Sequence, residues 1–410
     1  MKRVLVMAAI AWIFLVAPLG AAEHGGQASI SERFREARAL AFEGRRAEAS
    51  ALCLEILSED PGASETKTLL GRINAWEGNY DQARKLLSEV VDANPRDADA
   101  RRALIDVEVW SGRPEIAREL AKQGLELRPG NSNLLVASAR ALSKLGLAEE
   151  ALAAAKEAVV ADPDDYEKRK FYRLLLEDTQ KNKLTADYRR EWFNDSTEPW
   201  AMTSISYRRE FGWGSIIPRL NVAERFGQTD VQFEVDSYPE VGDQMYAYLN
   251  FGVSGNDLFP EIRYGAELYR NFRKGWEASF GFRRLEFDSG AVTIVTGSVA
   301  RYIGKYWIEV RPQFVTKDSG DSFSGRVRIR RFFNGRYEYM ELSAGAGDDL
   351  GSDLVDTASD LDSSSVQVSY NRRVRDSLIL KSTLGIEREN LSNGRNRDGI
   401  FFRLGLDYLF

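Results

Sequence analysis

The sequence predicts an α-helical solenoid domain followed by an antiparallel transmembrane β-barrel. Three observations carry this prediction: a 34-residue repeat in the first half, alternating apolar and polar side chains in the second half, and an apolar face that continues to the last residue, Phe410. We expect the helical domain, with its closing helix, at residues 30–181 and the barrel at residues 182–410.

The composition excludes several classes of function. The 410 residues include 56 Lys and Arg against 62 Asp and Glu, so the net charge of -6 leaves no basic excess for nucleic-acid phosphates. The single Cys53 and the single His24 cannot form a disulfide, a metal cluster or a nucleophile activated by His. We therefore expect no nucleic-acid partner, no metal, no cofactor and no enzymatic activity; an enzyme based on Asp or Glu alone is the alternative left open.

The N-terminus is typical of an export signal. Basic residues open the chain, an apolar run extends to Leu19, and small residues follow up to Ala22. This pattern predicts a signal peptide at residues 1–22 and a disordered mature N-terminus at residues 23–29. The alternative, an uncleaved membrane anchor, is disfavoured by Pro18 near the end of the run.

Three columns of small or helix-ending residues repeat every 34 positions in the helical domain. Alanine lets two helices cross closely, and proline ends the second helix of a helix-turn-helix unit. The columns are Gly44, Gly78, Gly112 and Gly146; Ala49, Ala83, Ala117 and Ala151; and Pro61, Pro95, Pro129 and Pro163. We therefore expect four helical pairs, closed by a helix from Tyr166 to about Lys181.

The second of these repeats resembles the tetratricopeptide (TPR) consensus, with matching residues at Gly71, Gly78, Tyr80, Ala83 and Pro95. Repeats of this type bind partners and do not catalyse reactions. Cys53 falls on a packing position of the first repeat, where it serves as a small hydrophobic residue.

One aromatic column of the repeats has a possible binding role. Phe42, Trp76 and Trp110 recur at the same 34-residue spacing, and Arg38 and Arg72 lie four positions before the first two. The TPR resemblance places this face of the first helix in the concave groove, where the rings would bind a periplasmic protein or a glycan. In the alternative interpretation, the rings fill gaps between repeats or stack on their own arginines.

The second half of the chain has the alternation of β-strands. Segments of about ten residues, rich in aromatic residues, Val and Arg, are separated by Gly, Asn and Asp. One apolar face, for example, is formed by Met245, Ala247, Leu249, Phe251 and Val253. Alternation alone would also suit a soluble β-sandwich with one wet face.

The C-terminus favours the membrane barrel over the sandwich. Its apolar face consists of Ile400, Phe402, Leu404, Leu406, Tyr408 and Phe410. The final octet matches the signal by which outer-membrane barrels resemble one another and are recognised by the insertion machinery, with Arg403, Gly405, Tyr408 and Phe410 at the matching places. Outer-membrane lipid and that machinery are therefore expected partners.

Loop lengths predict the number of strands. Short turns alternate with longer loops, and this alternation gives fourteen strands, or twelve if two short strands merge. Pro218 and Pro312 fall within strands, where each removes a ladder hydrogen bond, so we expect local bulges there.

The stretch from Trp200 to Phe287, which contains YRREFGWGSIIPRLNVAERFG and GWEASFGFRRLEF, resembles the YaiO-type outer-membrane β-barrel family. The resemblance covers roughly the last 220 residues. It implies a barrel in the outer membrane of a Gram-negative bacterium, with the TPR domain in the periplasm. The family is similar in plan to exopolysaccharide exporters, which also join TPR repeats to a barrel.

The faces predicted to line the barrel lumen carry both acids and bases. The candidate lumen residues are Arg326, Arg328, Arg330, Glu267, Glu277, Arg283 and Arg311. They would form either a polar conduit for an anionic or hydroxyl-rich solute or a plug of paired charges. The sequence therefore predicts a component of exopolysaccharide or cell-surface glycan export, or alternatively a membrane-anchored scaffold whose repeats recruit a protein beside a closed barrel.

Overall fold

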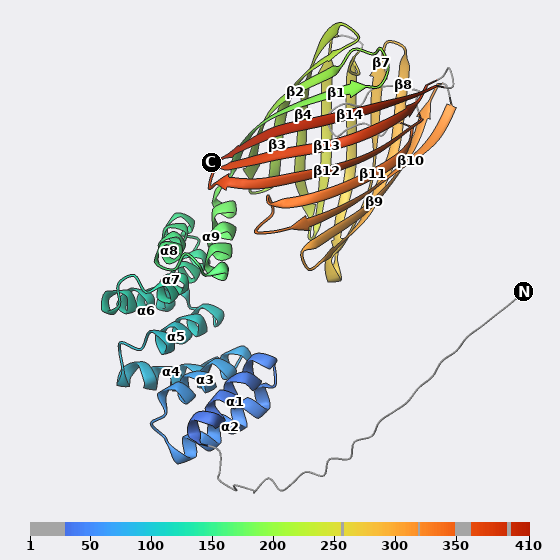
Figure 1. Ribbon diagram of the computed structural model, residues 1–410. Coiled ribbons are helices and arrows are strands. Elements are labelled where there is room, and N and C mark those ends of the chain that lie inside the picture. The colour runs from blue at the N-terminus through green and yellow to red at the C-terminus, as the bar shows by residue number, and fades with distance from the viewer. Residues whose placement is uncertain (1–28, 256–257, 319, 349–361, 392–394) are drawn as a thin grey trace, which may run out of the picture. The chain divides into compact units, whose positions relative to one another are not determined.

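The computed structural model describes residues 29–255, 258–318, 320–348, 362–391 and 395–410. In these ranges the chain forms nine α-helices and then fourteen strands that close into one barrel (Figure 1), which confirms the predicted fold class. Two compact units divide at residue 129, so helices α1–α6 belong to the first unit and α7–α9 belong to the second with the barrel. The predicted signal peptide lies outside the described residues.

The first eight helices form four antiparallel pairs of similar length, and the ninth leads into the barrel. None of the described helices is long and apolar enough to cross a membrane. Their bounds are α1 Ile30–Glu43, α2 Arg46–Glu59, α3 Ser64–Trp76, α4 Tyr80–Ala93, α5 Ala98–Trp110, α6 Pro114–Leu127, α7 Ser132–Lys144, α8 Ala148–Ala161 and α9 Tyr166–Thr179.

The repeated columns explain where the helices of each pair turn and end. The glycine of each pair has a positive φ of 76° to 87°, and a Cβ added there would meet no atom within 4 Å. Backbone conformation, and not crowding, therefore favours glycine at the turn. The alanine column is fully buried between the helices. The second helix of each pair ends two residues before its proline.

The thiol of Cys53 is fully buried on α2, in a cluster with Ala37, Ala49 and Leu69. Burial raises the pKa of this thiol to about 11, because the surroundings disfavour the charged thiolate. We expect the folded protein to resist a thiol reagent at pH 8 and to react once urea unfolds the repeats. The chain has one Cys, so labelling reports on this site alone. Rapid labelling of the folded chain would contradict the buried position.

The strands follow one another around the barrel, and each pairs antiparallel with its neighbours in the chain. β1 pairs with β14 from Lys183 and Leu409 to Phe193 and Gly399, which closes the ring. The strands are β1 Asn182–Phe193, β2 Trp200–Phe211, β3 Gly214–Arg225, β4 Gln228–Gly242, β5 Met245–Ser254, β6 Ile262–Phe272, β7 Trp276–Phe287, β8 Gly290–Ile303, β9 Tyr306–Lys317, β10 Gly320–Phe332, β11 Tyr339–Asp348, β12 Asp362–Arg375, β13 Leu378–Asn390 and β14 Asn396–Leu409. We call the end that holds Asn182 and Phe410 the short-turn end.

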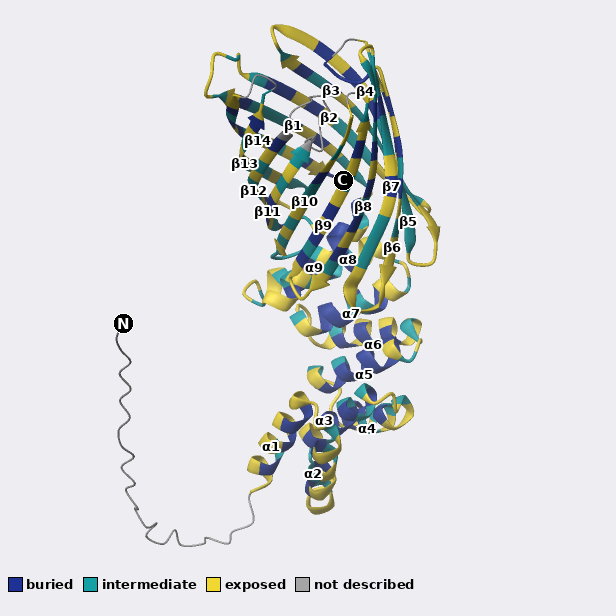
Figure 2. Ribbon diagram, turned by 90° about the vertical axis from the view of Figure 1, so that its right-hand side faces the viewer, coloured by how far each residue is buried: buried dark blue, intermediate teal, exposed yellow. Residues whose placement is uncertain are grey.

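The two faces of the barrel wall differ in polarity. On β5, Leu249, Phe251 and Val253 are exposed on the outer face, whereas Asn250 between them is buried on the inner face. Figure 2 shows the same alternation of buried and exposed residues along many strands. An apolar outer face and a polar inner face are typical of barrels that span membranes.

Pro218 and Pro312, the two prolines at which bulges were predicted, do not create them, so this part of the sequence prediction is wrong. At Pro218 and Pro312 the pairing with one neighbouring strand is interrupted and then resumes in the same register. Each missing N–H removes a ladder bond, but no extra residue enters the strand. The register shifts instead at residues 240–242 and 373–375, beside tight turns of the short-turn end.

Candidate functional site

Buried ion pairs cover the inner wall of the barrel on strands β3 to β6. Arg219 on β3 donates to Glu234 at 2.9 Å and to Asp236 at 2.8 Å, both on β4. Arg263 on β6 donates to the other oxygen of Glu234 at 2.8 Å and to Asn250 at 3.0 Å. Each carboxylate is almost fully buried, so these bonds offset its desolvation.

A second network continues around the wall from β6 to β10. Arg311 on β9 donates to Glu267 at 2.7 Å, to Tyr269 at 3.1 Å and to Glu309 at 3.3 Å. Glu309 also accepts a bond of 2.7 Å from Arg328 on β10. The predicted lumen residues Glu267, Arg311 and Arg328 are therefore joined in one chain of alternating charge.

A cavity of about 300 Å³ lies inside the barrel, beside these networks. Its charged lining comprises seven cations and three carboxylates. The cations are Arg189, Arg219, Arg326, Arg328, Arg330, Lys381 and Arg403, and the carboxylates are Asp187, Glu341 and Glu387. In the ring of fourteen strands, β3 with Arg219 lies opposite β10 with the three consecutive inward arginines, so the cavity reaches across the lumen.

Apart from Tyr339 and Phe401, uncharged polar side chains form the remaining lining of the cavity, on β11 to β13. They present hydroxyl and amide groups and carry no charge. These residues are Ser343, Ser365, Gln367, Ser369, Asn371 and Thr383. Because serine and threonine are small, this wall leaves room in the lumen and offers donors and acceptors for hydroxyl groups.

The predicted lumen residues all lie on inward-facing positions, but only some of them meet. Arg326, Arg328 and Arg330 line the cavity, whereas Glu277 accepts a bond of 3.2 Å from Tyr246 outside it. Arg283 is half-buried on the wall beside Gly265, away from the cavity lining.

The four residues of the proposed insertion signal divide between the two faces of β14. Tyr408 and Phe410 are exposed on the outer face, with ring centroids 5.5 Å apart. Arg403 and Gly405 face the lumen, where Arg403 donates to Asp187 at 3.2 Å. A Cβ on Gly405 would clash with that carboxylate, so glycine makes room for Asp187 as well as matching the signal.

The structure brings two of the three predicted groove aromatics together. Phe42 on α1 is 66% exposed and meets Trp76 on α3 edge to face, with centroids 5.7 Å apart. Arg46 lies over Trp76 at 5.7 Å. Trp110, at the end of α5, is 44% exposed.

The two arginines predicted to accompany these rings lie elsewhere. Arg72 points away to Asp99, to which it donates at 2.6 Å, and Arg38 is exposed on α1. The alternative interpretation, in which each ring stacks on the arginine four residues before it, therefore does not hold for Trp76. The sequence offered no signal for Arg46, because it belongs to the second helix of the pair.

Ion pairs and hydrogen bonds attach helix α9 to the turns at the short-turn end of the barrel. Glu177 pairs with Arg373 of β12 at 3.3 Å and accepts a bond of 3.3 Å from the backbone of Arg336. Tyr172 donates to Asp376 at 2.6 Å. Burial and the Asp376 carboxylate raise the pKa of Tyr172, which keeps its hydroxyl protonated as a donor. These contacts were not predicted, because they join residues more than 150 positions apart.

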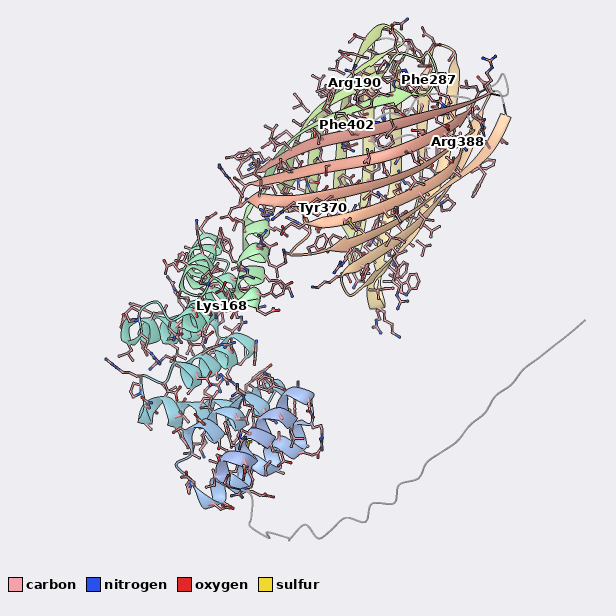
Figure 3. The ribbon with its side chains drawn as sticks, in the orientation of Figure 1. Lys168, Arg190, Phe287, Tyr370, Arg388 and Phe402 are labelled. Atoms are coloured by element: carbon pink, nitrogen blue, oxygen red, sulfur yellow. The ribbon has the colours of Figure 1, made fainter. Side chains whose placement is uncertain are left out.

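Arginines and aromatic rings alternate on the outer face of the barrel near the short-turn end. Arg209 lies over Phe211 at 5.5 Å, and Arg270 lies over Phe272 at 5.4 Å. Arg331 on β10 repeats the arrangement with Phe333 at 5.3 Å. Higher on the wall, Arg190 and Phe402 lie on the outer face of the paired strands β1 and β14 (Figure 3). Such amphipathic pairs suit a membrane–water interface.

Comparison with known families is consistent with this geometry. Residues 181–349 match the model of the YaiO membrane beta barrel domain. The chain carries a YaiO-type membrane barrel. Residues 40–105 and 75–126 match tetratricopeptide repeats, so this YaiO-type barrel is preceded by TPR repeats, a fold that binds other proteins. Neither domain is of an enzyme type.

Solved structures similar to part of the chain include TPR proteins. The thermophilic TPR protein TTC0263 from Thermus thermophilus is 22% identical, with a TM-score of 0.35, and the match covers 37% of this chain and 83% of that protein. MamA from Desulfovibrio magneticus is 15% identical, with a TM-score of 0.31, and the match covers 38% of this chain and 88% of that protein. These similarities concern the fold of the repeats alone. No curated protein matches the chain.

Proposed function

We propose that this protein is an outer-membrane component of exopolysaccharide or cell-surface glycan export in a Gram-negative bacterium. The observation that carries the proposal is the lumen cavity, where a wall of hydroxyl and amide side chains on β11 to β13 lies beside a ladder of arginines on β10. Such a lining forms hydrogen bonds with sugar hydroxyls along a chain. The TPR repeats lie in the periplasm and receive the glycan or a biosynthetic partner before it reaches the barrel.

The outer face of the barrel supports this location. Exposed apolar side chains cover it, and Arg–aromatic pairs such as Arg209 with Phe211 mark its short-turn end. The export signal predicted at residues 1–22 would deliver the chain beyond the cytoplasmic membrane. Short turns face the periplasm in barrels of this kind, and this supports a periplasmic position for the short-turn end and α9.

The proposal is tested by deleting the gene in the source bacterium and measuring glycan on the cell surface and in the periplasm. We expect surface glycan to fall and periplasmic glycan to accumulate, with recovery when the wild-type gene is returned. Unchanged glycan in both compartments would contradict a role in export. Fractionation of wild-type cells tests the location, and recovery of the protein in any fraction other than the outer membrane would contradict it.

Exposed aromatics of the repeats make the groove a candidate receiving site. We expect Trp110→Ala to weaken binding of the purified surface glycan to the full-length protein by about two- to ten-fold, because a ring that stacks on a sugar is lost. Titration calorimetry in detergent measures the effect. Leu54→Ala is the matched control, since Leu54 is also an exposed apolar residue of the first unit but lies on a second helix. Equal loss in both variants would contradict a role of the groove.

A second candidate function is a membrane-anchored scaffold, in which the TPR repeats recruit a periplasmic protein and the barrel is closed. The dense ion pairs around Glu234 and Arg311 support this alternative, because paired charges fill part of the lumen. Conductance of the full-length protein in a planar bilayer separates the two. Steady conductance favours export, whereas silence, together with normal function after the barrel is replaced by a lipid anchor, favours the scaffold.

A further inference from the structure

We propose that the lumen cavity is a binding site for an acidic glycan segment, a polyhydroxylated chain that carries carboxylate or phosphate groups. This inference deepens the proposed export function, on which it rests, by naming the chemical class of the substrate. It follows from which member of each ion pair is the more exposed.

The cations of the cavity lining are more accessible than the carboxylates that they pair with. The side chain of Arg403 is 30% exposed and its partner Asp187 only 5%. Arg328 is 17% exposed against 3% for Glu309. The same order holds for the pairs Arg219–Glu234, Arg330–Glu341 and Lys381–Asp187. Arg189 follows the order with Glu191 at 2.9 Å but not with Glu387 at 3.5 Å, which is more exposed than Arg189.

This order sets the sign of charge that a solute meets inside the barrel. Asp187 and Glu341 also line the cavity, but each is less exposed than its cation, so these carboxylates fix the cationic groups in place without covering them. A ligand in the cavity therefore meets more positive than negative charge, although the ion pairs leave the wall itself close to neutral. Confinement by the surrounding wall strengthens this attraction, because field lines are focused into the water-filled space.

The guanidinium groups are also held in fixed positions for recognition. Arg330 is bonded to Glu341 at 2.8 Å and lies 4.0 Å over the ring of Tyr339. Arg328 and Arg330 both lie 5.1 Å from the centre of the Trp307 ring. Planar, pre-oriented guanidinium groups suit carboxylate and phosphate oxygens, and little side-chain entropy is lost when they bind.

The uncharged wall on β11 to β13, which begins beside the arginine ladder of β10, adds to the specificity. Ser343 and Ser369 carry hydroxyl groups and Gln367 and Asn371 carry amides, all within the cavity lining. A small inorganic anion would bind the arginines and make no contact with this uncharged wall. A sugar chain with acidic groups uses both walls, since its hydroxyls meet the polar residues while its charges meet the cations.

The experiment is a calorimetric titration of the full-length protein, refolded in detergent, with three probes of equal length: hexagalacturonate, phosphorylated maltohexaose and maltohexaose. We expect at least one acidic probe to bind about ten-fold or more tightly than the neutral one, with weaker binding as salt rises from about 50 to about 500 mM. The tighter acidic probe identifies carboxylate or phosphate as the preferred group. Equal binding of the neutral probe, or no binding of any probe, would overturn the proposal.

A paired variant locates the binding in the cavity without changing net charge. Arg330→Gln combined with Glu341→Gln removes an exposed cation together with its more buried partner, so no buried charge is stranded. We expect acidic probes to bind about ten-fold more weakly to this variant. Arg331→Gln, on the outer face of the same strand, is the matched control and should bind like the wild type. Wild-type affinity in the paired variant would overturn the assignment to the cavity.

Two further controls keep the outcome interpretable. Folding of each variant is checked by its shifted migration in unheated SDS gels. If the paired variant does not fold, Arg403→Gln replaces it. Asp187 is then not left without a countercharge, because it retains Lys381 at 3.2 Å. The cellular glycan experiment remains separate. Selective binding of acidic probes with normal surface glycan would overturn export and leave the site, whereas lost glycan without such binding would overturn the site and leave export.

Discussion

Arg311→Leu is expected to lower the stability of the folded barrel by about 3–5 kcal/mol, the largest effect of any single substitution in the lumen. Arg311 is almost fully buried and is shared by the carboxylates of Glu267 and Glu309. Its removal leaves Glu267 without its cation in the barrel wall, whereas Glu309 keeps Arg328 at 2.6 Å. A buried carboxylate without a countercharge costs far more than the net gain of the intact pair.

The measurement is the midpoint of urea unfolding in lipid vesicles, followed by migration in unheated gels. Arg331→Leu serves as the control, because it makes the same chemical change on the outer face of the adjacent strand. The double variant Glu267→Gln with Arg311→Met should recover part of the loss, since it removes both charges together. An unfolding midpoint of Arg311→Leu equal to that of the wild type would show that the pair contributes nothing to the barrel.

Periodicity explains why so much of the fold could be predicted from the sequence. The spacing of Gly44, Gly78 and Gly112 corresponds to turns with positive φ, and the alternation around Leu249 corresponds to two faces of a strand. Both signals are local, because each depends on residues of one element only. The inward positions of Arg326 and Arg328 follow from the same alternation.

The cavity and the fastening of α9 could not be predicted, because both depend on which strands lie opposite or beside one another. Asp187 on β1 meets Lys381 on β13 and Arg403 on β14 only after the ring has closed. Alternation identifies these residues as inward-facing, but it gives neither their partners nor their exposure. The sign of charge presented to a ligand depends on that exposure, so a count of acids and bases could not give it.

Glycines show how one residue can meet several requirements at once. Gly405 belongs to the predicted C-terminal insertion signal and also leaves space for the Asp187 carboxylate. Gly335, in the turn between β10 and β11, leaves space for Glu177, since a Cβ there would lie 2.6 Å from a carboxylate oxygen. In both positions a missing side chain lets an acidic residue from a distant segment approach the backbone.

Glu177→Ala is expected to loosen α9 from the barrel and to speed amide exchange in residues 166–179 by about 100-fold, equivalent to about 3 kcal/mol. Glu177 and Arg373 are both nearly fully buried, so the substitution leaves the Arg373 guanidinium without its countercharge. Gln180, which accepts a bond of 3.2 Å from Arg373, retains only part of the attachment. Hydrogen–deuterium exchange of the full-length protein in detergent measures the change peptide by peptide.

Glu167→Ala is the matched control on the same helix, because Glu167 is 76% exposed and lies 3.9 Å from Lys170. Exchange of α9 should be unchanged in this variant. Gly335→Ala disturbs the same contact through a residue of the barrel. Gly335 has a φ of 145°, and an added Cβ would crowd Glu177, so this variant should also speed amide exchange of α9. If α9 exchanged at the wild-type rate in both Glu177→Ala and Gly335→Ala, its attachment would depend on the short connection to β1 alone.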